Sequence, residues 1–281
     1  MLFDCLLLRY GELFLKGKNQ GIFEDKLIAN IKKITAVKNC RRMRGRVILP
    51  YFPDHHSIKR VFGVGSYSPA IKVGKTMEEI KAAALSLFQG KTGTFRVATK
   101  RSDKTFPGTS LQINAEVGRY IEAHLSLQFH YEHPDHLLHI EINTAGAFIF
   151  TEIIPCFGGL PEGVEGKALL LVEDEASLIA GLLMMRRGCS LLPVSFQEQD
   201  LSLLNLYSSK KLKLHLLQNY EELEELSKQY NIPLLITGEI FSTYTKQGNL
   251  TTLRPLIAYT PSEIKKELEK YSFPSSNTST N

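Results

Sequence analysis

Apolar and polar positions near the start of the chain alternate with two different periods. Residues 3–10 form a short apolar run that is typical of a strand, and residues 23–34 carry apolar side chains at helical spacing. Residues 41–50 predict a basic strand edge that runs into apolar positions. Residues 57–73 predict a short helix, a glycine turn and a strand. This order is typical of a ferredoxin-like α+β unit.

A second segment again mixes helices with strands. Amphipathic helices are predicted at 77–89 and 111–125, and a strand is predicted at 94–100. Residues 136–154 predict a pair of strands around a glycine turn. The next twelve residues, 155–166, contain two prolines and four glycines, which indicates a linker.

The third segment alternates strands with helices. Such alternation argues for a parallel sheet in an α/β layer. The strands are predicted at 168–172, 190–196, 211–217 and 233–239, and the helices at 177–185 and 220–230. The last eight residues, 274–281, are polar and lack apolar anchors, so we expect them to be disordered.

Charge is distributed unevenly along the chain. Residues 1–105 hold 21 Lys+Arg against 8 Asp+Glu, whereas residues 106–281 hold 13 against 21. A basic half attracts a polyanion, and nucleic acid is the commonest one for a cytoplasmic protein. No apolar run approaches the roughly 18 residues of a membrane span, so we expect a cytoplasmic protein without a membrane partner. A solvated charged face remains the alternative reading of the basic half.

One basic loop has the composition of an RNA contact. Lys100, Arg101 and Lys104 lie close to Phe106, which places cations beside an apolar, stacking surface. For any single one of these residues, a solvated loop is the alternative. Further cations that would extend the track are Lys16, Lys18, Arg41, Arg42, Arg44 and Arg46.

Metal chemistry is not indicated by the sequence. The four cysteines lie far apart and form no CxxC pair. His133, His136 and His139 have threefold spacing, but proline and aspartate interrupt the stretch, which favours a role at a strand edge or turn.

Several long strings resemble the tRNA 4-thiouridine synthetase family. RYGELFLKGKNQGIFEDKLIANI is similar to the family's opening, VATKRSDKTFPGTSLQINAEVG to its THUMP domain, and FTEIIPCFGGLPEGVEGK to its entry into the PP-loop (pyrophosphatase-like) domain. The likeness returns at LLITGE and LRPLIAYTPSEI. It implies a ferredoxin-like domain at 1–72, an RNA-binding THUMP domain at 73–165 that holds the tRNA acceptor region, and a PP-loop α/β domain at 166–273. In active members, that last domain adenylates a uridine with ATP before sulfur transfer.

The turn after strand 168–172 departs from the family's pattern. Active members carry Ser-Gly-Gly-x-Asp-Ser there, whereas this chain carries Glu173, Asp174, Glu175 and an alanine before Ser177, one residue fewer. Side chains replace the glycines where phosphate must approach the backbone, and each carboxylate beside a triphosphate adds repulsion of about 1 kcal/mol. The acids satisfy the helix N-terminus instead. We therefore interpret the turn as a vestigial nucleotide loop.

Two further details concern the same domain. Ile240–Thr243 follow the TGE sequence, where the family usually continues with a Ser-Leu-Gly-Gln type loop. Mg²⁺ held by Glu173, Asp174 and Glu175 is an alternative, but consecutive residues seldom converge on one ion.

The function favoured by the sequence is tRNA binding without adenylation, with no catalytic residue, no metal and no cofactor. A second copy of the chain or a separate tRNA-modifying enzyme would be its protein partner. The alternative is an active ATP-dependent tRNA sulfurtransferase with a diverged nucleotide loop, which would need ATP and Mg²⁺ and would keep Ser177 as a phosphate ligand. A third hypothesis is a scaffold whose basic half meets an acidic protein.

Overall fold

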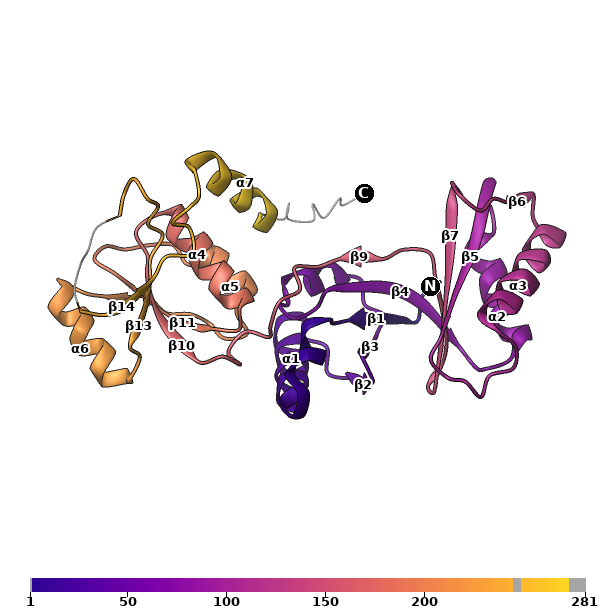
Figure 1. Cartoon of the computed structure of the whole chain (residues 1–281), viewed down its shortest axis with the longest axis horizontal. Coiled ribbons are helices and arrows are strands. Elements are labelled where there is room, and N and C mark those ends of the chain that lie inside the picture. Colours follow the sequence, from indigo (N-terminus) through magenta and orange to yellow (C-terminus); the bar gives the residue numbers. More distant parts are fainter. Residues whose placement is uncertain (1, 245–248, 273–281) are drawn as a thin grey trace. The chain divides into compact units, whose positions relative to one another are not determined.

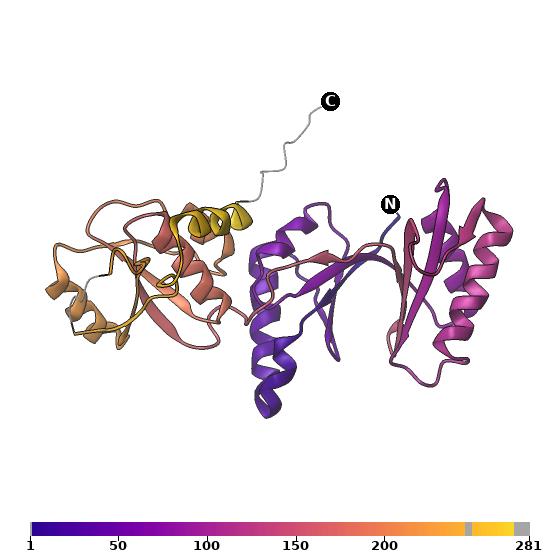
Figure 2. The same ribbon diagram turned by 45° about the horizontal axis from the view of Figure 1, so that its top comes forward.

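The structure, a computed structural model, describes residues 2–244 and 249–272 (Figure 1 and Figure 2). It comprises two compact units, and each is described by itself below. Unit 1 contains Met1–Arg9, Val37–His55 and Ser66–Pro155, and unit 2 contains Tyr10–Ala36, His56–Gly65 and Cys156–Asn281. The domain boundaries expected from the sequence stay predictions, and the expected disordered tail at 274–281 lies outside the described residues.

Unit 1 contains one mixed sheet and two helices. The sheet order is β2-β3-β1-β4-β8-β7-β5-β6, with β9 paired to β4. The strands are β1 (Cys5–Arg9), β2 (Arg41–Met43), β3 (Arg46–Pro50), β4 (Ser66–Val73), β5 (Gly93–Arg101), β6 (Leu127–Phe129), β7 (His136–Asn143), β8 (Gly146–Phe150) and β9 (Ile154–Pro155), and the helices are α2 (Met77–Phe88) and α3 (Ser110–His124).

Helices α2 and α3 cover one face of strands β5, β7 and β8, as Figure 1 shows. Alternate residues of the strands, such as Val97 and Ile140, point toward the helices and are buried against Ile80 and Val117. Burying each such side chain contributes roughly 1.5–3 kcal/mol. This core fixes the position of the loop between β5 and α3.

A half-buried ion triad lies within unit 1. Arg9 of β1 and Arg46 of β3 both contact the Glu141 carboxylate of β7, at 3.0 and 2.9 Å. Burial opposes ionisation of Glu141, but the two guanidiniums outweigh it and hold the pKa of this carboxyl below its ordinary value. The triad joins strands from both ends of the unit, and removing the carboxylate would leave two half-buried guanidiniums without this partner.

Unit 2 is built around a parallel sheet. Its strand order is β12-β11-β10-β13-β14. The strands are β10 (Lys167–Leu171), β11 (Ser190–Ser195), β12 (His215–Leu216), β13 (Leu234–Ile236) and β14 (Thr251–Leu253), and the helices are α1 (Gln20–Thr35), α4 (Glu175–Arg186), α5 (Ser202–Tyr207), α6 (Tyr220–Tyr230) and α7 (Pro261–Tyr271). Two short 3₁₀ helices, η1 (Glu12–Asn19) and η2 (His55–Arg60), complete the described elements.

Both faces of this parallel sheet are covered (Figure 2). Leu170 and Ile236 are buried together with residues of α4, α5 and α7, whereas Leu169 and Leu235 are buried with Leu223 of α6 on the other face. A strand that is buried on both faces reads as a continuous apolar run, which is what Ala168–Val172 shows.

The fold class expected from the sequence is confirmed: a mixed sheet with helices precedes a parallel α/β domain. The single basic strand predicted at 41–50 is wrong, because Gly45, with φ +72°, turns the chain into the β2-β3 hairpin. The predicted strand at 211–217 shrinks to β12. Among the described helices, none combines the length and the apolar character that a membrane crossing requires.

The segment 155–166 is more than a linker. The Glu162 side chain is only 4% exposed, and its carboxylate accepts a hydrogen bond from Ser209 Oγ at 2.7 Å. The Asn30 side chain of α1 donates to the Glu162 carbonyl at 3.0 Å. These contacts bind the segment and α1 to the α/β domain within unit 2. The glycines that suggested a free linker instead allow tight turns, since Gly158, Gly159, Gly163 and Gly166 all have positive φ.

Candidate functional sites

The basic loop between β5 and α3 is held by its own hydrogen bonds. The Asp103 carboxylate accepts from Lys75 Nζ at 2.8 Å and from the Thr105 amide at 2.9 Å. The bond from Lys75, followed by the bonds from Thr105, holds the pKa of Asp103 well below its ordinary value. Thr109 then caps α3 in a capping box with Gln112. The loop is therefore a defined structure that presents Lys104 to solvent, and Lys100, which the sequence placed in the loop, is exposed near the end of strand β5.

Two residues that the sequence assigns to RNA contact have other roles. Phe106 is only 4% exposed and packs in the core under α2 and α3, so its expected stacking role is wrong. It lies between polar residues and a Pro-Gly pair, with no apolar periodicity around it, which is why the sequence pattern did not reveal the burial. Arg101 donates through Nη1 to the carbonyl oxygens of Phe106 and Gly108, and it thereby holds the loop.

The remaining predicted contact residues have different surroundings. Lys16 forms an ion pair with Glu165 at 2.8 Å and lies 4.6 Å from the centre of the Phe23 ring. Lys18, on the same 3₁₀ helix, is exposed, and so are Arg42 and Arg44 on the β2-β3 hairpin. Since Lys16 and Lys18 belong to unit 2 and the other cations to unit 1, a continuous track stays a prediction.

The acidic turn before α4 closes on itself. Ser177 Oγ accepts from the amides of Glu173 and Asp174, both at 3.0 Å, and the Ser177 amide donates to Asp174 Oδ1 at 2.9 Å. Asp174 is thus the N-cap of α4, and Ser177 completes a capping box. Ser177 is 1% exposed, whereas Glu173, Asp174 and Glu175 are exposed. Three amides of the turn, those of Glu173, Asp174 and Ser177, therefore already have partners.

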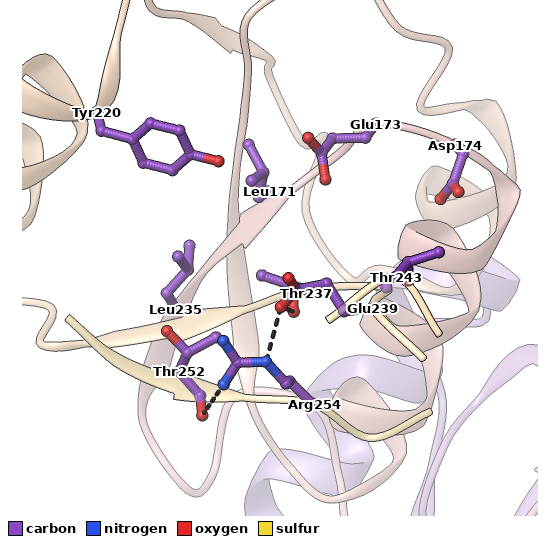
Figure 3. Close-up of a pocket in the computed structure, with 11 residues that line it drawn as sticks. Leu171, Glu173, Asp174, Tyr220, Leu235, Thr237, Glu239, Thr243, Thr252 and Arg254 are labelled. Carbon is purple, nitrogen blue, oxygen red and sulfur yellow. Dashed lines mark hydrogen bonds and ion pairs between the residues drawn. The ribbon is translucent and has the colours of Figure 1, made fainter. Parts of the chain in front are cut away.

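A small pocket lies at the carboxyl ends of β10, β13 and β14, where open parallel sheets usually bind ligands (Figure 3). Its volume is about 210 Å³, below the roughly 300–1,000 Å³ of typical ligand sites. Residues that line it include Glu173, Asp174, Tyr220, Thr237, Glu239, Thr243 and Arg254. Among the described residues that line it, Arg254 is the single cation, and it is bound to Glu239 through a 2.7 Å ion pair.

Negative charge dominates this pocket. Burial, followed by the charges of Asp174 and Glu239, raises the pKa of Glu173, and burial together with Glu173 and Glu239 raises the pKa of Tyr220. The backbone of Gly238 lies against the first turn of α4, so that a Cβ on Gly238 would collide with Ala176 and Ser177. The negative side chains of the pocket and the close packing of Gly238 against α4 therefore both disfavour binding of an anion.

The sequence did not single out Tyr220, Glu239 or Arg254 as pocket residues. The available signal was topological, because the carboxyl ends of neighbouring parallel strands converge at one edge of a sheet. The residues after predicted strand 233–239 therefore belonged to the same edge as the acidic turn. The loop that follows exposes Phe241 at 84%, where the family's loop is expected near nucleotide.

Within the described ranges, no group of three His, Cys, Asp or Glu residues has the geometry to hold a metal ion. His136 Nε2 lies 3.0 Å from the Thr92 carbonyl, and the His139 ring stacks on Phe150 with centroids 5.0 Å apart. These histidines thus belong to the sheet and its edge.

Comparison with known proteins decides the family. A model of the ThiI ferredoxin-like domain matches residues 5–68, and a model of the THUMP domain matches residues 74–152. A probable tRNA sulfurtransferase from Mycoplasmopsis synoviae is 30% identical over an alignment that covers 94% of this chain and 83% of the relative. The chain belongs to the tRNA sulfurtransferase family.

Other relatives of this tRNA sulfurtransferase family member differ in length. The chain is 42% identical to a probable tRNA sulfurtransferase from Moorella thermoacetica, but it spans only about half (53%) of that protein. PH1313 from Pyrococcus horikoshii has a similar structure, with a TM-score of 0.84, 30% identity and coverage of 95% of this chain and 99% of that one. A 4-thiouridine synthetase in complex with RNA and ATP matches with a TM-score of 0.82, 25% identity and coverage of 96% and 85%.

Proposed function

We propose that this chain binds tRNA through its THUMP domain. The structurally similar 4-thiouridine synthetase is described as an RNA complex, and the THUMP model covers residues 74–152 here. Lys100 and Lys104 are exposed at one end of that domain, and neither forms an ion pair with a described carboxylate. Cations in this condition are available to phosphate, so affinity should fall as salt rises.

We propose further that the chain does not adenylate the tRNA it binds. The observation that carries this is the acidic turn: Ser177 Oγ and the Asp174 carboxylate occupy the amides of Glu173, Asp174 and Ser177. In a phosphate-binding turn, such amides point at the ligand. Here a triphosphate would have to displace them and approach three exposed carboxylates.

ATP, the nucleotide named for the similar 4-thiouridine synthetase, does not fit the residues present in this pocket. The cavity of about 210 Å³ is lined by Glu173, Asp174 and Glu239, and Arg254 already neutralises Glu239. Glu173 and Asp174 are exposed carboxylates, and each would repel a phosphate placed beside it because both groups are anions. The domain would then present tRNA to a second copy of the chain or to a separate modifying enzyme in the cytoplasm.

An active ATP-dependent tRNA sulfurtransferase is the second candidate. The names of the relatives favour it: both the Mycoplasmopsis synoviae and the Moorella thermoacetica proteins are named probable tRNA sulfurtransferases. The comparisons fit this candidate better than they fit a loss of activity. It requires the acidic turn to open and to accept ATP and Mg²⁺, with Ser177 released from its capping bonds.

Incubation of the purified chain with a tRNA transcript and labelled ATP-Mg²⁺ separates the candidates. Pyrophosphate release and label on the RNA are followed, and tRNA binding is measured in the same sample. Binding that weakens with salt, without label transfer, supports the proposal. Transfer of label to the RNA would establish the second candidate, and absence of tRNA binding would exclude both.

A further inference from the structure

The free edge of β5 in unit 1 borders a groove that the proposed tRNA-binding and nucleotide sites do not use. Strand β6 pairs with β5 only over Gly93–Phe95, and no strand of the described residues pairs with residues 96–101 of β5 on that side. Helix α3 and the segment 129–131 form the other walls. The groove has a volume of about 840 Å³, which lies in the range of ligand sites.

Backbone groups of β5 point into this groove. Neighbouring residues of a strand direct their amides to opposite sides, and Phe95 O accepts from His130 N on the free side, so Val97 and Thr99 face the same way. The Thr99 amide is bound by Asn114 Oδ1 at 2.9 Å. For the Val97 amide and carbonyl, the described residues offer no partner on this side. A side-chain amide thus already occupies one position where an added strand would place its carbonyl.

The rim of the groove is apolar and exposed. Leu111, Phe129 and Tyr131 are 78%, 51% and 70% exposed, although they are large hydrophobic side chains. Grouped exposed hydrophobic residues mark interaction surfaces, whereas scattered ones do not. Ala115 and Gly118 on α3 leave the floor open, because a Cβ built on Gly118 would meet no atom within 4 Å.

Two guanidiniums supply charge at the same rim. Arg96 lies over the Tyr131 ring at 5.6 Å and donates to the Tyr131 carbonyl at 3.0 Å, and the Arg119 Nε donates to the Ala115 carbonyl. Neither guanidinium forms an ion pair among the described residues. A partner that carries a carboxylate would complement them.

We propose that this groove binds an extended peptide segment of a partner protein, with apolar side chains and at least one carboxylate, which adds to the free edge of β5. About four residues would lie along Arg96–Thr99, given the rise of roughly 3.3 Å per strand residue. Main-chain hydrogen bonds to Val97 would set the register, and the apolar rim would select side chains.

Two observations favour a peptide over an RNA strand. The unpaired groups of Val97 have the spacing of a strand edge. The Glu122 carboxylate, held by the Phe129 amide at 2.9 Å, lines the groove and would repel phosphate.

Filling the groove tests the proposal without disturbing the core. In G118L, a leucine side chain would occupy the open floor, and Gly118 has no positive φ that a side chain would strain. G21L is the matched control, since Gly21 is also a helical glycine with open space around it, in α1. Short random peptides displayed on phage are selected on the wild-type chain and counter-selected on G118L.

We expect the enriched peptides to have apolar residues at alternate positions and to contain an acidic residue. A synthetic copy of such a peptide should bind G118L more than about tenfold more weakly than the wild-type chain, and should bind G21L as tightly as the wild-type chain. Hydrogen exchange of the Val97 amide should slow in its presence. Failure to enrich any peptide over the G118L background would overturn the proposal. Equal binding to both variants, or protection of Val97 by single-stranded oligouridine, would also overturn it, and the latter would assign the groove to RNA.

Discussion

Two helix N-termini of this chain are capped alike and differ in the charges around them. Thr109 begins α3 and Asp174 begins α4, each in a capping box that satisfies two backbone amides. Before α3, Lys100 and Lys104 are exposed, whereas Glu173, Asp174 and Glu175 surround the start of α4. Backbone amides are therefore occupied by a capping box in both turns, and the sign of the neighbouring charge is what distinguishes the two.

The largest expected effect concerns what supports the α3 loop. F106A removes a side chain that is 4% exposed, so we expect the free energy of unfolding to fall by about 3–5 kcal/mol. F129A is the matched control, because Phe129 is 51% exposed and should lose less than about 1 kcal/mol. Urea titrations measure both. If F106A kept the stability of the wild type but bound tRNA more weakly, Phe106 would have the base-stacking role that the sequence predicted.

The next effect tests the cations themselves. K100A/K104A removes two exposed cations and leaves Arg101 and its loop bonds intact. The tRNA affinity should therefore fall about tenfold or more, and the slope of log affinity against log salt should decrease by an amount that corresponds to about one to two phosphate contacts. The matched pair K210A/K211A removes two adjacent exposed lysines of the α/β domain. Binding isotherms at several salt concentrations compare them. Equal losses in both double variants would mean that only net charge matters.

The smallest effect concerns the acidic turn. A raised pKa of Glu173 means that the folded chain favours its protonated form, so its stabilising contribution is present below its ordinary value of 4.5 and is lost as pH rises through the folded value. E173Q stays neutral and should therefore become more stable relative to wild type as pH rises above about 4.5. Glu173 is exposed, which keeps the gain small. Unfolding titrations at acidic and neutral pH would reject this reading if the variant lost stability as pH rose.

Periodicity and turn residues predicted most elements, because the alternating apolar residues of β5 and β7, the apolar run of β10 and the helical spacing of α2 and α3 are buried in the cores. The hairpin β2-β3 was missed because its turn depends on one glycine inside a run of arginines. Short elements such as α5 and β14 carry too few residues for a periodic signal.

Prediction of the sites was less complete for a physical reason. Cations and acids can be read directly from the sequence, so the residues of the acidic turn could be named in advance, and its interpretation as a vestigial nucleotide loop stays a prediction. The burial of Phe106 and the convergence of Tyr220 and Arg254 on the pocket depend on tertiary packing, which a local pattern does not contain. The charge of a site can therefore be predicted from the sequence, whereas the burial of its residues and the shape of its pocket require the fold.

The most direct test of the account is the response of the α4 turn to nucleotide. In amide NMR spectra of the full chain, ATP-Mg²⁺ is titrated to millimolar concentration, and the amides of Glu173, Asp174 and Ser177 are compared with those of the capped turn at Thr109 and Gln112. The account predicts no saturable shift at the α4 turn, since its amides are bound within the turn. Saturable shifts confined to that turn, with a micromolar Kd, would contradict it and restore an ATP site.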